Sequence, residues 1–250
     1  MPHDHSIQYM HDPFLMLLSF LVSVLGSFTA LQMAVAIPAA QNAGQRWRAI
    51  LGSGLAMGGG AIWAMHFIAM LACKMDTNAM ISYDLAITAG SAVVAVVSCA
   101  VGLAIVGSGV FSLGKLILAG LLMGLGVTGM HYSGMAAILM PADIHYDMTL
   151  VFASAVIAVV ASIVALWLAF NLRGWLQMLG SAVVMGLAVC GMHYTGMLAA
   201  SFVPNPAKAV PAGISSANLG MSIFVVSTVL LVTMLSISLL RQRQRQMVQI

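Results

Sequence analysis

The chain alternates long apolar stretches with short charged segments. Seven windows without a charged residue, each 25 residues or longer, lie between consecutive charges: 13–45, 49–73, 85–114, 116–142, 148–172, 174–207 and 209–240. A helix needs only about 20 apolar residues to cross the hydrocarbon core. Lipid offers backbone N–H and C=O groups no hydrogen-bond partner, so these windows must form helices, in which the backbone groups pair with one another. We predict an all-α integral membrane bundle of seven transmembrane helices, with Pro38, Pro141, Pro204 and Pro206 near helix ends.

Composition supports the same fold class. Of the 250 residues, 62% are hydrophobic, nine are Lys or Arg, and the six acidic residues are all Asp. About a quarter of the residues in a soluble domain are charged, so lipid must be the main solvent here. The net charge of +3 reflects topology and does not indicate nucleic-acid binding. The three cysteines form no C-x-x-C pair and imply no disulfide framework.

The distribution of basic residues predicts the orientation. One side of a seven-span topology carries seven of them: Arg46, Arg48, Lys115, Arg173, Arg241, Arg243 and Arg245. The other side carries only Lys74 and Lys208, together with every Asp. Because basic residues stay cytoplasmic, we expect the N-terminus outside and the C-terminus inside. The chain then divides into an extracytoplasmic tail (1–12), a membrane domain (13–240) and a short basic cytoplasmic tail (241–250).

A repeated motif occurs in three of the predicted helices. Residues 64–70, 129–135 and 191–197 align without gaps in the pattern small, Met, His, aromatic, any, small, Met. The histidines are 65 and 62 residues apart, which fits one outward and one returning helix. We therefore predict one helix followed by a twice-spanning unit repeated three times. The motif helices run in parallel around an axis along the membrane normal, and their histidines should meet in the outer half of the bilayer.

The motif residues suit a soft metal ion. Each histidine shares a helix face with the second methionine, four residues later. The predicted ligands are His66, His131 and His193, with Met65, Met70, Met130, Met135, Met192 and Met197. Cys190 lies one turn before His193 and offers an additional thiolate. No Asp or Glu lies in these spans to balance Zn(II), whereas imidazole suits copper and thioether selects Cu(I). The oxidation state, Cu(I) or Cu(II), remains open.

Other interpretations of these residues remain open. A membrane-embedded histidine can simply bond a backbone carbonyl, and most of the 21 methionines suit flexible apolar packing. Two histidines could hold a haem in an electron-transfer protein. A copper or proton transporter would use the same residues, although the inner halves of the spans offer few polar groups. The seventh span has no Lys for a retinal Schiff base. No carboxylate lies near the motif histidines, so we expect no enzyme.

The remaining polar segments predict no site of their own. His3, His5, His11 and residues 143–147 are expected to be a disordered tail and a solvated loop, with outer-surface metal capture as the alternative. Their replacement should matter much less than replacement of the motif histidines. The run Arg241-Gln242-Arg243-Gln244-Arg245 should extend the last helix as a positive-inside anchor. It also offers a route by which a signal leaves the membrane.

Met130-His131-Tyr132-Ser133 and Met192-His193-Tyr194-Thr195 resemble the signature of the bacterial MHYT family of membrane sensor domains. The third motif matches all four letters, the second has Ser for Thr, and the first keeps only Met65-His66. The likeness covers nearly the whole chain. It implies a protein of the bacterial cytoplasmic membrane that binds copper through Met, His and Cys residues and detects O2, CO or NO through the metal.

The resemblance also implies an output. Members of the family often carry cytoplasmic domains that make or degrade cyclic di-GMP, phosphorylate a partner or bind DNA. Here ten residues follow the last predicted span. We therefore expect a stand-alone protein or a truncated receptor that signals through a homo-oligomer or a cytoplasmic output protein at residues 241–250.

Overall fold

A computed structural model describes residues 6–77, 80–172 and 174–248. In this part of the chain, seven helical spans are long and apolar enough to cross a membrane. They are α1 (Pro13–Ala34), the second span (Ala43–Ala72), α4 (Leu85–Val106), α5 (Leu113–Ala136), α6 (Met148–Asn171), α7 (Trp175–Leu198) and α8 (Ser216–Val248). The predicted fold class is confirmed, and α8 continues through the basic run as expected. His3, His5 and Arg173 lie outside the described residues.

Side-chain caps begin most of the spans. Asp12, Asp84 and Asp147 cap α1, α4 and α6, where each carboxylate accepts hydrogen bonds from backbone N–H groups of the first turn. At the opposite end of the bundle, Asn42 and Ser112 cap the second span and α5. The negative charge of a carboxylate is also stabilised at the N-terminus of a helix, the positive end of the helix dipole. Acidic residues therefore gather at the end where α1, α4 and α6 begin.

Short antiparallel strands join the two ends of each of three helical hairpins. β1 (Tyr9–His11) pairs with β2 (Cys73–Met75), β3 (Ser82–Tyr83) with β4 (Ile138–Leu139), and β5 (Ala142–Tyr146) with β6 (Ala200–Pro204). The backbone N–H of each capping Asp donates to a carbonyl at the other end of its hairpin, in all three cases over 2.9 Å. These equivalent contacts define three structural units, which we number 1 (residues 9–75), 2 (82–139) and 3 (142–204).

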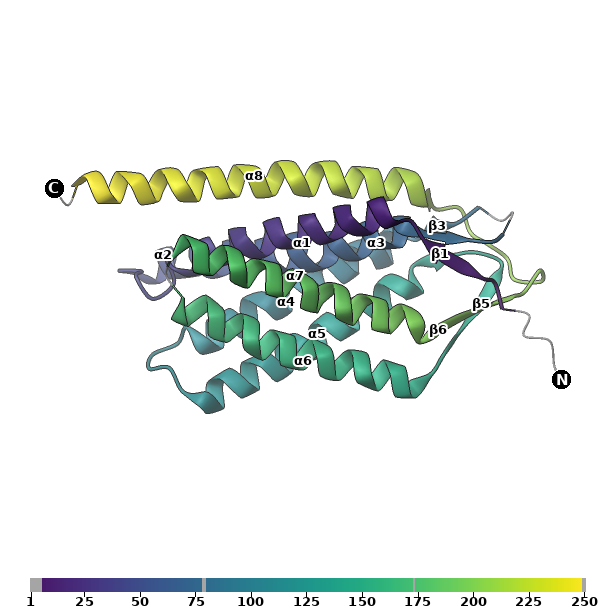
Figure 1. The fold of residues 1–250 in the computed structure, drawn as a ribbon, viewed down its shortest axis with the longest axis horizontal. Helices are drawn as coiled ribbons and strands as arrows, with labels where there is room; N and C mark the ends of the chain where they lie inside the picture. The colour runs from purple at the N-terminus through teal and green to yellow at the C-terminus, as the bar shows by residue number, and fades with distance from the viewer. Residues whose placement is uncertain (1–5, 78–79, 173, 249–250) are drawn as a thin grey trace.

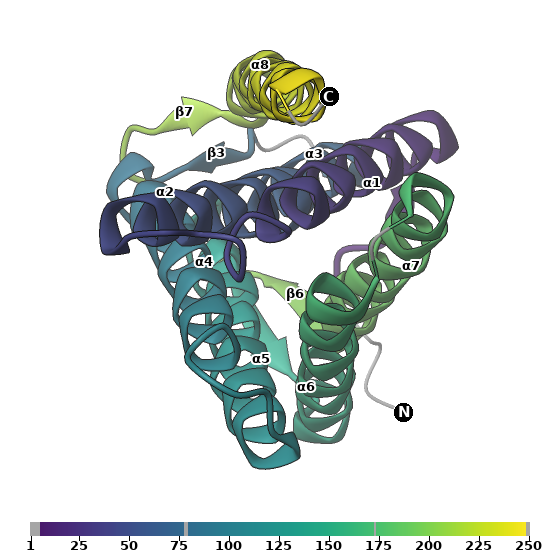
Figure 2. The same ribbon diagram turned by 90° about the vertical axis from the view of Figure 1, so that its left-hand side faces the viewer.

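The three units form a closed ring. Seen along the bundle, they lie as the sides of a triangle, with α8 outside it against unit 1 (Figure 2). α1 packs against both the second span and α7, which closes the ring. The sequence repeat runs from one motif helix to the next, whereas each folded unit pairs a motif helix with the span before it. α1 consequently belongs to unit 1, and α8 is left outside, beside α1, η1 and α3 (Figure 1).

The second span is not a uniform α-helix. It consists of α2 (Ala43–Gly54), the π-helix η1 (Leu55–Ala64) and α3 (Met65–Ala72), whereas α5 and α7 are continuous α-helices. Its 30 residues exceed the 24 of each of the other two motif helices. A methyl group on Gly58 would meet the backbone of Ala95 in α4, and one on Gly60 would meet Leu231 in α8. The close approach of both helices to η1 depends on these two glycines.

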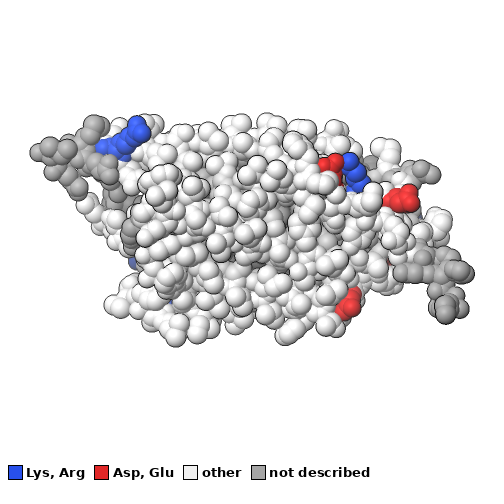
Figure 3. All heavy atoms as spheres, viewed as in Figure 1, with Lys and Arg blue, Asp and Glu red and all other residues white. Residues whose placement is uncertain are grey.

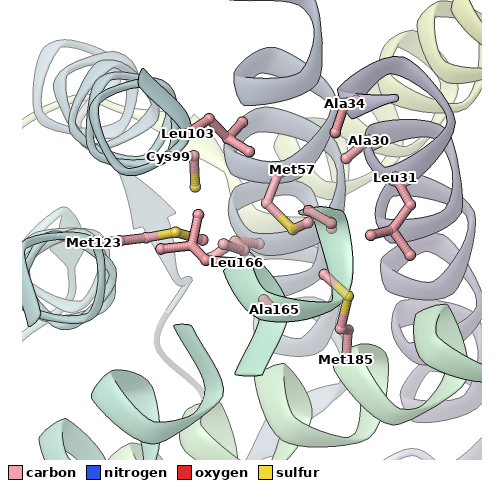
Figure 4. Close-up of a cluster of buried hydrophobic side chains, with 14 of the residues drawn as sticks. Ala30, Leu31, Ala34, Met57, Cys99, Leu103, Met123, Ala165, Leu166 and Met185 are labelled. Atoms are coloured by element: carbon pink, nitrogen blue, oxygen red, sulfur yellow. The ribbon is translucent and has the colours of Figure 1, made fainter. Parts of the chain in front are cut away.

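Two layers of buried side chains fill the ring. The layer nearer the α2 end contains Met57, Met123 and Met185, one from each unit, among alanines and leucines (Figure 4). The layer nearer the strands contains larger rings such as Tyr83 and Phe202. Outside the ring, side chains such as Phe152, 72% exposed, face the surroundings, as expected of a protein whose solvent is lipid.

The expectation of an irregular tail and loop is wrong in the described region. Residues 9–11 form β1 and residues 142–146 form β5. These strands have two to five residues, too few to establish a period-2 pattern. Their partners lie about 60 residues away at the far end of a helical hairpin, where local sequence patterns carry no information about pairing.

Charged side chains lie at the two ends of the bundle and are absent from the apolar surface between them in the view of Figure 3. Arg46 donates to the carbonyl of Gly107 at one end. At the other end, Lys74 pairs with Asp12 at 2.7 Å and Lys208 with Asp143 at 3.3 Å. The hydrogen bond from Lys74 holds the pKa of the Asp12 carboxyl below its usual range. The basic residues at the strand end are therefore balanced by carboxylates.

This asymmetry predicts that the strand end is extracytoplasmic. Reporter fusions after Lys74 should give the extracytoplasmic signal, and fusions after Lys115 the cytoplasmic one, because only the latter end carries unbalanced basic residues. A cytoplasmic signal at Lys74 would contradict the predicted orientation.

Candidate metal site

The three motif histidines meet inside the ring. His66 comes from α3, His131 from α5 and His193 from α7, and their exposed fractions are 1%, 0% and 1%. Each lies five or six residues before the end of its helix, about 8–9 Å from the strand end. The predicted convergence of the motif helices at a common depth is therefore present in the structure.

The Nδ1 atoms of the three imidazoles point toward one another. The Nδ1 of His66 lies 3.1 Å from that of His193 and 3.2 Å from that of His131. The ring centroids are 5.0–5.2 Å apart and the ring planes are inclined by 82–84°, so the rings have nearly threefold symmetry. Three nitrogen ligands at about 2.0–2.1 Å from one tetrahedral ion stand roughly 3.3–3.4 Å apart. A metal ion fits after the nitrogens separate by a few tenths of an ångström.

Hydrogen bonds among the three Nδ1 atoms cannot satisfy all of them. A neutral imidazole nitrogen is either a donor or an acceptor, so at least two of the three have the same role. A central cation would accept a lone pair from each nitrogen. No carboxylate belongs to this group, because the described Asp residues lie at helix ends and in the outer segments. The uncharged ligand set favours a monovalent ion, which costs less to desolvate than a divalent one.

Two of the three imidazoles contact the neighbouring unit with their outer edges. None of the three Nε2 atoms has a hydrogen-bond partner among the described residues. The Nε2 of His66 lies against Gly134 of unit 2, and that of His131 lies against Gly196 of unit 3, where an added methyl group would overlap each ring. Ala69 is the corresponding motif residue in unit 1. Packing against the next helix therefore fixes the outer edges of the His66 and His131 rings, while their Nδ1 atoms lie within hydrogen-bond distance of each other at the centre.

A layer of aromatic rings separates the histidines from the strands. Each histidine makes an edge contact with the ring that follows it in the motif, with centroids 4.8–4.9 Å apart. Three further rings, each preceding a capping Asp, contact this layer: Tyr83 on Phe67, Tyr146 on Tyr132 and His11 on Tyr194. Burial, with a smaller contribution from Tyr132, raises the pKa of Tyr146 to about 12. The threefold pattern therefore reaches the strands, but its third member is a histidine.

The motif methionines are all buried. Met130 and Met192 belong to the layer nearer the α2 end, whereas Met70, Met135 and Met197 belong to the layer nearer the strands. Met65 is likewise buried, with 1% of its surface exposed. Cys190 lies half-buried on α7. The histidine layer thus lies between two groups of thioethers, and their role as ligands stays a prediction.

The contacts of the motif glycines predict which of them shape the site. Gly134→Ala and Gly196→Ala should each lower the free energy of unfolding by about 1–3 kcal/mol, because the new methyl group overlaps a buried imidazole. Gly129 and Gly191 are matched controls from the same motif, since nothing lies within 4 Å of a methyl group added there. Alanine at the controls should be neutral or stabilising by up to about 1 kcal/mol. Thermal unfolding in one detergent measures all four, and equal values would contradict the proposed contact.

Comparison with known proteins gives the same repeat. The family model MHYT, described as a bacterial signalling protein N-terminal repeat, matches residues 59–119, 124–182 and 186–250. The chain is 39% identical over 240 residues to the bifunctional diguanylate cyclase/cyclic di-GMP phosphodiesterase MucR of Pseudomonas aeruginosa, covering 93% of this chain and 34% of that protein. No solved structure matches this chain.

Two further relatives have the same character. The cyclic di-GMP phosphodiesterase NbdA of Pseudomonas aeruginosa is 34% identical over 200 residues, covering 76% of this chain and 24% of that protein. The signaling protein YkoW of Bacillus subtilis is 31% identical over 204 residues, covering 78% of this chain and 25% of that protein. The chain thus spans about a third or less of each of these relatives. Since all three copies of the family repeat are present, the chain belongs to the MHYT family of bacterial membrane signalling proteins.

Proposed function

We propose that this multi-pass membrane domain is a sensor that holds copper at His66, His131 and His193 and, through the metal, binds O2, CO or NO. The convergence of the three buried Nδ1 atoms carries the proposal. Three ligands leave one position of a tetrahedral ion open for a diatomic molecule. The ligands are neutral, which favours Cu(I), and the motif methionines supply thioethers that select the same ion. Cys190 is a further candidate ligand.

The structure supports this proposal better than the haem alternative. A haem between two axial histidines separates their ligand nitrogens by the width of the iron centre and inserts a macrocycle between them. Here the closest nitrogens are 3.1–3.2 Å apart, and neighbouring imidazoles make edge contacts. The site therefore has room for a single ion and no room for a macrocycle.

We further propose that the signal leaves through α8. Among the helices, this one packs mainly against the second span and α1, and Leu231, 1% exposed, is seated on Gly60 of η1. Gly60 precedes His66 by six residues along the same span. A change at His66 can therefore reach α8 through one continuous stretch of chain. The relatives MucR and NbdA, which are much longer than this chain, are named for cyclase or phosphodiesterase activity, and we propose that α8 passes the signal to an output of that kind.

Loss of any one motif histidine should weaken copper binding. His66→Ala, His131→Ala and His193→Ala should each lower the affinity for Cu(I) at least about tenfold, because each removes one of three ligands. Elemental analysis and competition with a Cu(I) chelator measure the change. Addition of CO to the copper-loaded protein should give a Cu(I)–carbonyl infrared band that the variants lack.

The controls separate ligand loss from loss of the fold. His145 lies exposed on β5, so His145→Ala should bind copper like the unmodified protein. Replacement of the six motif methionines by Leu, singly, keeps volume and apolarity, so a weaker affinity would report on the thioether. Unchanged copper stoichiometry in the triple His→Ala protein would rule out the site, and a Soret band would favour haem.

Leu231→Ala should uncouple α8 from the site. In the unmodified protein, copper should slow amide hydrogen exchange in both η1 and α8, because α8 rests on η1. Leu231→Ala removes the side chain that packs on Gly60, so in this variant copper should slow amide exchange in η1 but not in α8. Val232→Ala is the matched control, because that side chain is 49% exposed. Equal protection of α8 in both variants would contradict the route.

A further inference from the structure

The strand pair of unit 1 carries soft metal ligands on one face. β1 and β2 are antiparallel, with His11 opposite Cys73 and Tyr9 opposite Met75. Side chains alternate between the two faces of a strand, so these four residues share one face. It is the covered face: Cys73 is 7% exposed, whereas Met10 on the other face is 76% exposed. An imidazole, a thiol and a thioether thus lie together outside the motif site.

This strand pair is fastened to the helix that carries His193. The Tyr9 hydroxyl donates to the carbonyl of Met197 over 3.0 Å, one turn beyond that histidine. The ring of His11 makes an edge contact with Tyr194, with centroids 5.2 Å apart. Since Tyr194 follows His193 directly, the strand pair lies over the side of the three-histidine site that faces the strand end of the bundle.

The other two units show that this chemistry is a departure from the repeat. At the position of His11 they have Tyr83 and Tyr146, and these face Ile138 and Ala200 where unit 1 has Cys73. All three rings contact a motif aromatic residue in the same way. Packing alone is therefore satisfied by tyrosine opposite an aliphatic residue. Unit 1 has replaced both members of the pair with metal-binding types.

The metal-binding atoms of His11 and Cys73 are not engaged by another group in the described structure. His11 Nε2 is buried without a hydrogen-bond partner, and Cys73 is a free thiol. Buried polar nitrogens are normally paired. Burial lowers the pKa of His11 below its usual range, so its imidazole is neutral and has a lone pair. Directly opposed residues hold their Cβ atoms about 4.5–5.5 Å apart, which allows one ion to contact both side chains.

We propose that His11 and Cys73, assisted by Met75, form a second metal site that takes up a soft monovalent ion at the extracytoplasmic mouth and passes it to the three histidines. Thiolate, thioether and imidazole together select Cu(I). The thiolate neutralises the charge of the ion, and the thiol proton leaves to solvent. The transfer role rests on the proposed function of the three histidines, whereas binding at this outer site does not.

Silver(I), a redox-inert probe for Cu(I), tests the binding. In the His66→Ala/His131→Ala/His193→Ala protein, purified whole in detergent, one Ag(I) per chain should remain. Adding His11→Ala or Cys73→Ala should weaken that binding at least tenfold. Met10→Leu on the opposite face and Cys99→Ala in the buried core should have no effect. Absence of silver from the triple variant, or its retention in both the His11 and Cys73 variants, would overturn the outer site.

Two readouts on otherwise native protein keep the test independent of folding and of the proposed function. Ag(I) should protect Cys73 from maleimide, read by peptide mass spectrometry, and His11→Ala should weaken that protection. In proteoliposomes, His11→Ala should slow copper loading of the three histidines about tenfold and leave the final occupancy unchanged. Normal loading would overturn the transfer role alone. Protection of Cys73 without metal at the three histidines would instead overturn the proposed function and leave the outer site standing.

Discussion

The edge-on packing of two imidazoles, His66 and His131, against the backbone of neighbouring helices is the contact on which the histidine cluster depends. Their Nε2 atoms have no hydrogen-bond partner in the described structure, so the outer edges of these rings are held by packing alone. That packing requires glycine at 134 and 196, where a hydrogen atom is all that fits between helix and ring. It also requires motif helices of common depth, which the Asp-capped hairpins and their paired strands provide. Close packing at the outer edges thus helps to position these imidazoles.

Departures from threefold symmetry are concentrated in unit 1. It has the π-helix, alanine in place of the motif glycine, and the His11–Cys73 strand pair. The helix α8 also lies against this unit. Units 2 and 3 resemble each other: both have a continuous α-helix for the motif and a tyrosine at the position of His11. Each unit thus supplies one histidine to the cluster, while unit 1 alone differs in its motif helix and in its strand pair.

The sequence predicted the spans and the histidine site because the bilayer permits few alternatives. Seven uncharged windows had to become helices, and an identical motif on parallel helices had to lie at one depth. The outer strands were not predictable from local pattern, since their partners lie beyond a helical hairpin. Nor was η1, whose glycines Gly58 and Gly60 pack against α4 and α8, distant in the sequence. One local signal does precede the first helix of each unit: a ring followed by Asp, at His11-Asp12, Tyr83-Asp84 and Tyr146-Asp147.

Each unit closes on itself through its own strands, and only residues 76–81 and 140–141 link one unit to the next. Three separate two-helix chains could therefore assemble the same centre as a symmetric trimer. In such a trimer, every substitution would appear three times, once in each of the three equivalent units. Fusion of the copies into one polypeptide removes that constraint. A single copy could then differ in its strand pair and in its motif helix while its two sisters kept the geometry of the centre intact.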